Sequence, residues 1–183
     1  MNVLLLPYNI ASDISHKVRA LKSIGINAEG LAFPSSQIQT TTDVKLLANY
    51  TENRLANRRV ALKNLWMIYR AMRRADIIHW TCFLDILPRN LDERMIKFFD
   101  KPGVVQWYGS DIRNPEVERK INPFYDEIFE NGYEYQMESA EFSLKNQKKF
   151  AELGFYPLEF PEMSHYIERE LFPVRFETRQ MVF

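Results

Sequence analysis

Short apolar runs alternate along the chain with segments in which apolar residues recur every three or four positions. The runs predict β-strands and the spaced segments predict α-helices. The first run, residues 3–6, is continuously apolar, which is typical of a central parallel strand that is buried on both faces. The predicted strands lie near residues 2–7, 27–33, 76–80, 103–107 and 155–159.

The segment between the first two strands has the pattern of an amphipathic helix. Ser12 or Asp13 can cap its amino end, and Gly25 is expected just after its last turn. A strand, a helix and a strand within about thirty residues imply a right-handed crossover and a parallel pair. The turn after the first strand is neither Gly-x-Gly-x-x-Gly nor a P-loop, so it does not predict a phosphate-binding loop.

The rest of the chain predicts further helices and two less regular segments. Residues 37–57 are polar and are expected to form a loop with a short helix, and residues 133–136 are a candidate short strand. Later helices are expected over 91–99, over part of 116–129 with a break at Asn122–Pro123, and from a cap at Ser143 through residues 144–153. Apolar residues at helical spacing mark a strong amphipathic helix: Leu62, Leu65, Trp66, Tyr69 and Met72.

Composition narrows the class of protein. The chain has 183 residues, of which 46% are hydrophobic and 26% charged, and this profile is that of one soluble globular domain. The single Cys82 excludes an internal disulfide and fits a reducing compartment. No apolar run approaches the ~20 residues of a membrane span, and the amino terminus lacks the pattern of a signal peptide. We therefore expect a cytoplasmic protein.

The charge is zero overall but uneven along the chain. Residues 54–74 carry seven basic side chains and no acidic one, whereas residues 116–170 carry an excess of acids. Two interpretations of Arg54 to Arg74 are open: a solvated helix face, or a surface for an anionic partner. The partner would be a polyanionic acceptor or an anionic membrane, with the protein peripheral at the inner membrane face. The zero net charge gives no reason to expect nucleic acid.

The strongest candidate site follows the strand near residues 103–107, where the chain turns abruptly polar. Ligands of parallel sheets bind beyond the carboxyl ends of the strands, so polar side chains after three strands are expected to line one crevice. Gly109 would allow backbone to approach a ligand closely. The candidate binding residues are Tyr8, Asn9, His79, Tyr108, Ser110, Asp111 and Arg113.

Each of these residues also has a purely structural interpretation. Ser110 and Asp111 can cap the next helix, and Arg113 can pair with Asp111. His79 can act as a general base, although a histidine at a strand end is more often a hydrogen-bonded structural residue. His79 and Cys82 lack further clustered ligands, so no metal site is expected. No Gly-x-Ser-x-Gly elbow indicates a serine hydrolase, and no catalytic residue is assigned.

Three stretches resemble the amino-terminal half of GT-B-type glycosyltransferases of the group 1, retaining-like kind. They are Asn-Val-Leu-Leu-Leu-Pro-Tyr-Asn at 2–9, Ala-Asp-Ile-Ile-His at 75–79 and Trp-Tyr-Gly-Ser-Asp-Ile-Arg at 107–113. They follow the family's order over most of residues 1–114; beyond that the likeness is architectural. The chain departs from the family's pattern at Tyr108, where a histidine is frequent, and in its first turn, which lacks Gly-Gly.

The resemblance implies an α/β fold: a single Rossmann-like domain over residues 1–183, with a parallel sheet flanked by helices on both faces. It implies that this domain binds a saccharide or glycolipid acceptor and needs no cofactor of its own. A second Rossmann-like domain, in cis or in trans, would bind the nucleotide-sugar donor. Because 183 residues leave no room for it, the chain is expected to be one domain of a longer protein or a half-enzyme. The alternative is a non-catalytic binding or interaction module of the same fold.

Overall fold

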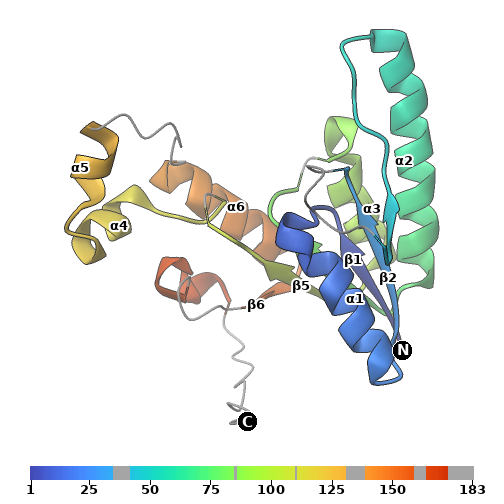
Figure 1. Ribbon diagram of the computed structural model, residues 1–183, viewed down its shortest axis with the longest axis horizontal. Helices are drawn as coiled ribbons and strands as arrows, with labels where there is room; N and C mark the ends of the chain where they lie inside the picture. Colours follow the sequence, from blue (N-terminus) through green and yellow to red (C-terminus); the bar gives the residue numbers. More distant parts are fainter. Residues whose placement is uncertain (35–41, 85, 110, 131–138, 159–163, 173–183) are drawn as a thin grey trace.

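A six-stranded sheet in which every pairing is parallel forms the centre of the protein (Figure 1). The structure is a computed structural model that describes residues 1–34, 42–84, 86–109, 111–130, 139–158 and 164–172. The strands lie in the order β3-β2-β1-β4-β5-β6, which is the order of Rossmann-like folds. Their bounds are β1 (Asn2–Leu6), β2 (Asn27–Ala32), β3 (Val44–Leu46), β4 (Ile77–Thr81), β5 (Gly103–Gln106) and β6 (Phe155–Leu158).

Helices connect the strands and cover both faces of the sheet. Because the strand order reverses at β1, right-handed crossovers place α1 on one face and α2, α3 and α6 on the other. The short helices α4 and α5 lie away from the sheet, at the left of Figure 1. None of the described helices is long and apolar enough to cross a membrane. The helices are α1 (Asp13–Ser23), α2 (Arg54–Arg74), α3 (Leu91–Phe99), α4 (Pro115–Ile121), α5 (Tyr125–Glu130) and α6 (Ala140–Glu152).

The two faces of β1 belong to two different cores. Val3 and Leu5 pack with Ile14 and Val18 of α1. Helix α1 lies so close to the sheet that a Cβ atom on Gly30 of β2 would come within 2.9 Å of the Ile14 side chain. The close approach fixes α1 directly over the sheet, and therefore fixes where the first turn of α1 lies at the carboxyl edge.

The opposite face carries the larger core. Leu4 and Leu6 join a cluster that includes the fully buried rings of Trp80, Trp107 and Phe150. Trp107 meets Phe150 edge-on, with ring centroids 5.9 Å apart. Burying a large apolar side chain contributes about 1.5–3 kcal/mol, so this aromatic group is a major source of the sheet's stability.

The parallel α/β fold is confirmed, and the five predicted strands agree with the observed ones to within one residue at each end. The expectation of a loop with a short helix over 37–57 was wrong in one respect. β3 forms there and extends the edge of the sheet by pairing with β2. Residues 133–136, the candidate short strand, lie outside the described residues.

Two details of the helices differ from the sequence prediction. Helix α6 begins four residues before the expected start, because Ser139 accepts from the backbone N–H of Phe142 and caps it. The expected cap, Ser143, is instead buried, and its hydroxyl donates to the carbonyl of Ile112. The predicted apolar stripe of α2 is also divided: Met72 is buried, whereas Leu62 and Trp66 are exposed.

Gly103 is required by the ring that lies against it. A Cβ atom at this position would lie 2.6 Å from the ring of Phe155, which is itself buried. We expect Gly103→Ala to lower the free energy of unfolding by about 1–3 kcal/mol, because the ring must move within a packed core. In the double variant with Phe155→Leu, urea unfolding should show a cost smaller than the sum of the two single costs.

Gly109→Ala is the matched control, because the nearest neighbour of its new methyl group would be the Arg113 side chain, at 3.8 Å, an ordinary van der Waals distance. It should change stability by no more than about 0.5 kcal/mol. Equal losses for the two glycine variants would contradict the assigned contact.

Candidate functional site

Five polar side chains meet at the carboxyl edge of β4 and β5, beside the first turn of α1. We call them the edge cluster: Asp13 and Lys17 from α1, His79 from β4, Gln106 from β5 and Tyr108 from the following loop. Helix α1 packs closely over β1 and β2, against Gly30, and the Lys17 side chain reaches from it to Gln106 on β5. The cluster lies where parallel sheets bind their ligands.

Asp13 connects α1 to the loop after β5. One of its carboxylate oxygens accepts from Lys17 Nζ at 2.6 Å and from the Tyr108 hydroxyl at 2.5 Å. The carboxylate also lies in the first turn of α1, where the helix dipole favours negative charge. About a quarter of the Asp13 and Lys17 side chains remains exposed, so both charges are within reach of a ligand.

Gln106 connects the buried half of the cluster. Its side-chain oxygen accepts from Lys17 Nζ and lies 3.0 Å from His79 Nε2. If the Gln106 amide were turned the other way, its NH2 group would point at the Lys17 ammonium, and two donors would face each other. The side-chain oxygen of Gln106 therefore faces Lys17 and His79. His79 therefore carries a proton on Nε2 and donates it to Gln106.

Burial sets the protonation states in the cluster. It lowers the pKa of His79 to about 4, with the nearby Lys17 charge acting in the same direction. Burial lowers the pKa of Lys17, although Asp13 opposes the change, and burial together with Asp13 raises the pKa of the Tyr108 hydroxyl. At neutral pH His79 is thus neutral and Tyr108 remains a donor.

Hydrogen bonds join the carboxyl ends of β1 and β4, the two strands at which the strand order reverses. The Thr81 hydroxyl accepts from the backbone N–H of Tyr8 at 3.0 Å and lies 3.1 Å from the Tyr8 carbonyl. The Tyr8 ring itself packs beside Phe33, with centroids 6.0 Å apart. The partly exposed members of the edge cluster, Asp13, Lys17 and Tyr108, belong to α1 and to the loop after β5.

Asp111 holds the loop that follows β5. Its carboxylate is buried and accepts from the backbone N–H groups of Tyr108 and Gly109, at 3.1 and 2.8 Å. Burial raises the pKa of Asp111 even though these N–H groups favour the charged form. The carboxylate thus fixes the position of Tyr108, whose ring and hydroxyl face the cluster.

The other residues predicted for the site take different positions. Asn9 is buried, and its side-chain oxygen accepts from the backbone N–H of Ser15 at 3.1 Å, so it fixes the turn into α1. Arg113 is half-buried beside Gly109, and no ion pair joins it to Asp111 in the described residues. Ser110 lies outside the described residues. Of the predicted set, His79 and Tyr108 belong to the edge cluster.

Sequence reasoning missed three members of the cluster: Asp13, Lys17 and Gln106. Two signals were present. Gln106 is a polar residue inside an apolar strand, which requires a buried partner. Asp13 and Lys17 are an acid and a base four residues apart on one helix face. Neither signal alone indicates that the two elements meet.

Two buried donors in and beside the cluster have no hydrogen-bond partner in the part of the chain that the structure describes. They are Gln106 Nε2 and Arg113 Nε. A buried donor without a partner carries a desolvation cost of about 1–3 kcal/mol, which an oxygen-bearing ligand or a water molecule would offset. Within the described residues, no group of three or more His, Cys, Asp or Glu side chains could hold a metal ion.

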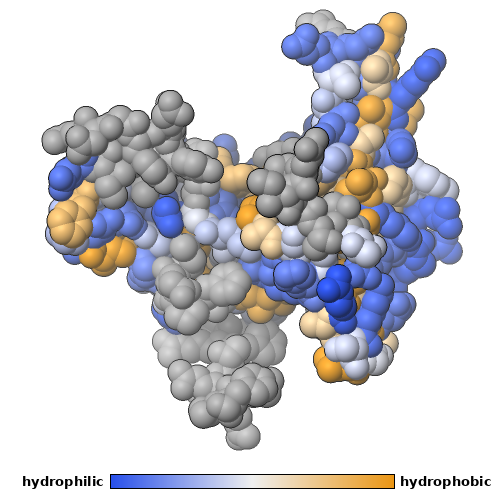
Figure 2. Space-filling view, in the orientation of Figure 1, coloured by the Kyte–Doolittle hydropathy of each residue, from blue (hydrophilic) through white to orange (hydrophobic). Residues whose placement is uncertain are grey.

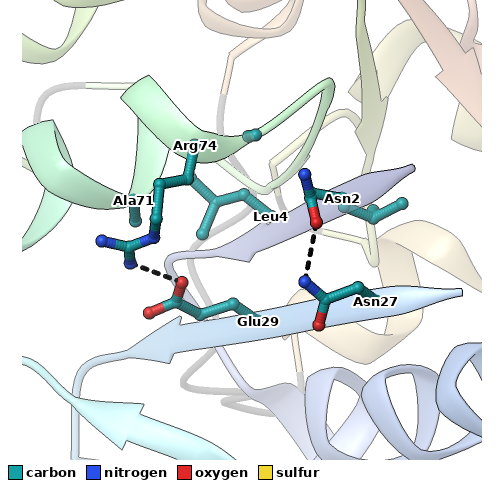
Figure 3. Close-up of a pocket in the computed structure, with 8 residues that line it drawn as sticks. Asn2, Leu4, Asn27, Glu29, Ala71 and Arg74 are labelled. Carbon is teal, nitrogen blue, oxygen red and sulfur yellow. Dashed lines mark hydrogen bonds and ion pairs between the residues drawn. The ribbon is translucent and has the colours of Figure 1, made fainter.

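A pocket of about 230 Å³ lies at the opposite end of the sheet, near the amino ends of β1 and β2 (Figure 3). Its polar groups already pair with one another. Glu29 accepts from Arg74 at 2.7 Å, and Asn27 donates to Asn2 at 2.7 Å. Burial alone would raise the pKa of Glu29, but hydrogen bonds from Lys45 and Arg74 outweigh it and lower the pKa. This pocket is therefore a satisfied structural junction.

The low pKa of His79 predicts a dependence of stability on pH. The folded state resists protonation down to about pH 4, whereas the unfolded chain takes up the proton near pH 6.5. The contribution is fully present above pH 6.5 and is lost as the pH falls toward 4. Between about pH 7.5 and about pH 5 the free energy of unfolding, measured with urea, should therefore fall by ~2 kcal/mol. His79→Gln can still donate to Gln106 but does not titrate, so the variant should not lose this stability between pH 7.5 and pH 5. If the pH dependence of stability were the same in the variant, His79 would not be its source.

Asp111 should contribute mainly to folding. Asp111→Ala leaves two backbone N–H groups without an acceptor, and we expect it to lower the free energy of unfolding by about 2–4 kcal/mol. Asp111→Asn keeps one oxygen for both N–H groups and should cost less than half as much. Urea unfolding of the two variants measures the difference, and wild-type stability in Asp111→Ala would exclude this role.

Comparison with known proteins gives no relative from which a function can be transferred. No family model matches the chain, and neither a curated protein nor a solved structure matches it. A functional conclusion therefore rests on the geometry of the edge cluster and on the residues that resemble GT-B-type glycosyltransferases.

Proposed function

We propose that the chain is the acceptor-binding domain of a GT-B-type glycosyltransferase, which takes a sugar from a nucleotide-sugar and transfers it to a saccharide or glycolipid. One observation carries the proposal. The edge cluster presents a partly exposed acceptor and donor, Asp13 and Lys17, beside the half-buried Tyr108 at the carboxyl edge of a parallel sheet.

The charge at the start of α1 supports a neutral ligand rich in hydroxyl groups. In Rossmann-like folds a phosphate usually binds at the amino terminus of the first helix. Here Asp13 places a carboxylate in that first turn, and this charge would repel a phosphate. A sugar hydroxyl can donate to Asp13 and accept from Lys17, and a sugar's apolar face can lie against Tyr108.

The proposal assigns the nucleotide-sugar and the transfer step to a second Rossmann-like domain, in cis or in trans. This division follows from the resemblance and from the absence of a Gly-rich phosphate loop after β1. The lone buried Cys82 supports a reducing compartment, so we place the protein in the cytoplasm. If no such domain is encoded with the chain or co-purifies with it, the non-catalytic binding module becomes the better description.

Saccharide binding by this chain tests the proposal directly. In amide NMR titrations with a panel of neutral mono- and disaccharides, the signals of Tyr108, Gln106 and the first turn of α1 should shift. Asp13→Asn should weaken binding about tenfold or more, because a hydrogen bond to a charged group contributes ~1.5–3 kcal/mol.

Asp126→Asn is the matched control, since Asp126 is an exposed acid on α5 that pairs with Arg119. It should leave saccharide binding unchanged. The proposal fails if no saccharide shifts the cluster, or if a nucleotide-sugar binds there in place of a saccharide.

A further inference from the structure

Helix α2 presents an exposed face that combines apolar and basic side chains. These residues recur every three or four positions and so form one stripe, which we call the α2 face. Its apolar members are strongly exposed: Leu55 by 72%, Leu62 by 66% and Trp66 by 60%. Its exposed basic members are Arg58, Arg59, Lys63, Arg70, Arg73 and Arg74.

An aromatic chain extends the α2 face onto α3. Trp66 stacks on Tyr69 with ring centroids 6.0 Å apart, and Tyr69 contacts Phe99 at 5.3 Å. Phe99 in turn contacts Phe98, which is 75% exposed. Figure 2 shows hydrophobic and hydrophilic residues side by side along α2, at the right of the molecule. Apolar surface is therefore continuous over two helices.

The charge on this face is one-sided. Helix α2 contains seven basic residues and no acidic one, while the other residues of the chain carry 17 basic against 24 acidic side chains. Arg74 pairs with Glu29. Within the described residues no acid forms an ion pair with Arg58, Arg59, Lys63, Arg70 or Arg73. The Arg70 guanidinium lies over the Trp66 ring, 5.8 Å from its centroid.

We propose that the α2 face binds the surface of an anionic lipid bilayer. Its leucine, tryptophan and phenylalanine side chains would enter the boundary between headgroups and acyl chains, as they do in interfacial amphipathic helices. The flanking arginines and lysine have long apolar stems that reach outward to the lipid phosphates. Each such cation near an anionic membrane contributes attraction, and together they complement the lipid charge.

Other binding partners would match only the charge or only the apolar side chains of the α2 face. A second copy of the chain would bring two acid-free basic helices together, and like charges oppose that contact. A nucleic acid would pair with the arginines but would leave Leu55, Leu62 and Trp66 against polar phosphates. Lipid is the partner that supplies negative charge and an apolar layer together. The inference does not depend on the proposed acceptor site.

Vesicle flotation and tryptophan fluorescence test the proposal. Trp66 reports the contact, because the other two tryptophans, Trp80 and Trp107, are buried. Phosphatidylcholine vesicles containing phosphatidylglycerol should bind the protein at low salt and shift the Trp66 emission to the blue. Phosphatidylcholine alone should bind it weakly. Binding should fall steeply with salt, because exposed charges are screened within ~8–10 Å at physiological ionic strength.

Pairs of variants separate the contribution of the basic side chains from that of the apolar side chains. Arg58→Glu with Arg59→Glu should weaken binding about tenfold or more. Lys145→Glu with Lys148→Glu makes the same charge change on the exposed surface of α6 and should have little effect. Leu62→Ser should weaken binding about tenfold, whereas Ile24→Ser, at a residue 71% exposed elsewhere, should not. All these side chains are exposed, so urea unfolding should confirm that the variants fold.

Three results would overturn the proposal. The first is the absence of vesicle binding at low salt. The second is an equal loss of binding in the control variants. The third is binding of heparin or duplex DNA, without a shift of Trp66 emission, in place of vesicle binding; this would assign the face to a soluble polyanion.

Discussion

The side-chain oxygen of Gln106 is the acceptor on which the carboxyl edge of the sheet depends. It receives hydrogen bonds from Lys17 and His79, and so ties α1 to β4 and β5. The buried Gln106 carbonyl would be costly without these donors, and so would the buried His79 without this acceptor. With the Lys17 ammonium fixed, Asp13 lies between it and the Tyr108 hydroxyl. One buried amide therefore determines the geometry of the accessible charges.

Much of the fold could be predicted, because apolar runs in a buried parallel sheet are visible in the sequence. The exceptions have physical reasons. β3 has only three residues, half-buried or exposed, and it is a strand because β2 offers an unpaired edge. The apolar spacing of α2 correctly predicted a helix, but it did not show which side of the helix is buried. Leu62 and Trp66 fit the same helical pattern as Met72, yet they are exposed whereas Met72 is buried. Which apolar residues of a helix face the core depends on packing that periodicity does not contain.

The site was less predictable than the fold. The strand-end rule found His79 and Tyr108, because the carboxyl ends of parallel strands share one edge. It could not find Asp13 and Lys17, because they lie on α1, which packs over β1 and β2, and they meet the cluster only through side-chain hydrogen bonds to Gln106 and Tyr108. Short polar side chains also have a competing use, since they readily bond to nearby backbone N–H groups. Asn9 bonds to the start of α1 in this way, and Asp111 bonds to its own loop.

The length of α2 relates the two proposed surfaces. Its 21 residues span about 31 Å, whereas the five residues of β4 span about 17 Å. Because α2 runs directly into β4, its amino-terminal half must extend beyond the carboxyl ends of the strands, as Figure 1 shows. Leu55 and Leu62 lie on this projecting half, at the same edge of the sheet as Asp13 and Tyr108. The edge cluster lies on the α1 face of the sheet and α2 covers the opposite face. The two proposed surfaces therefore share the carboxyl edge of the sheet but lie on different sides of it, so a bilayer bound to α2 would leave the edge cluster open to a ligand.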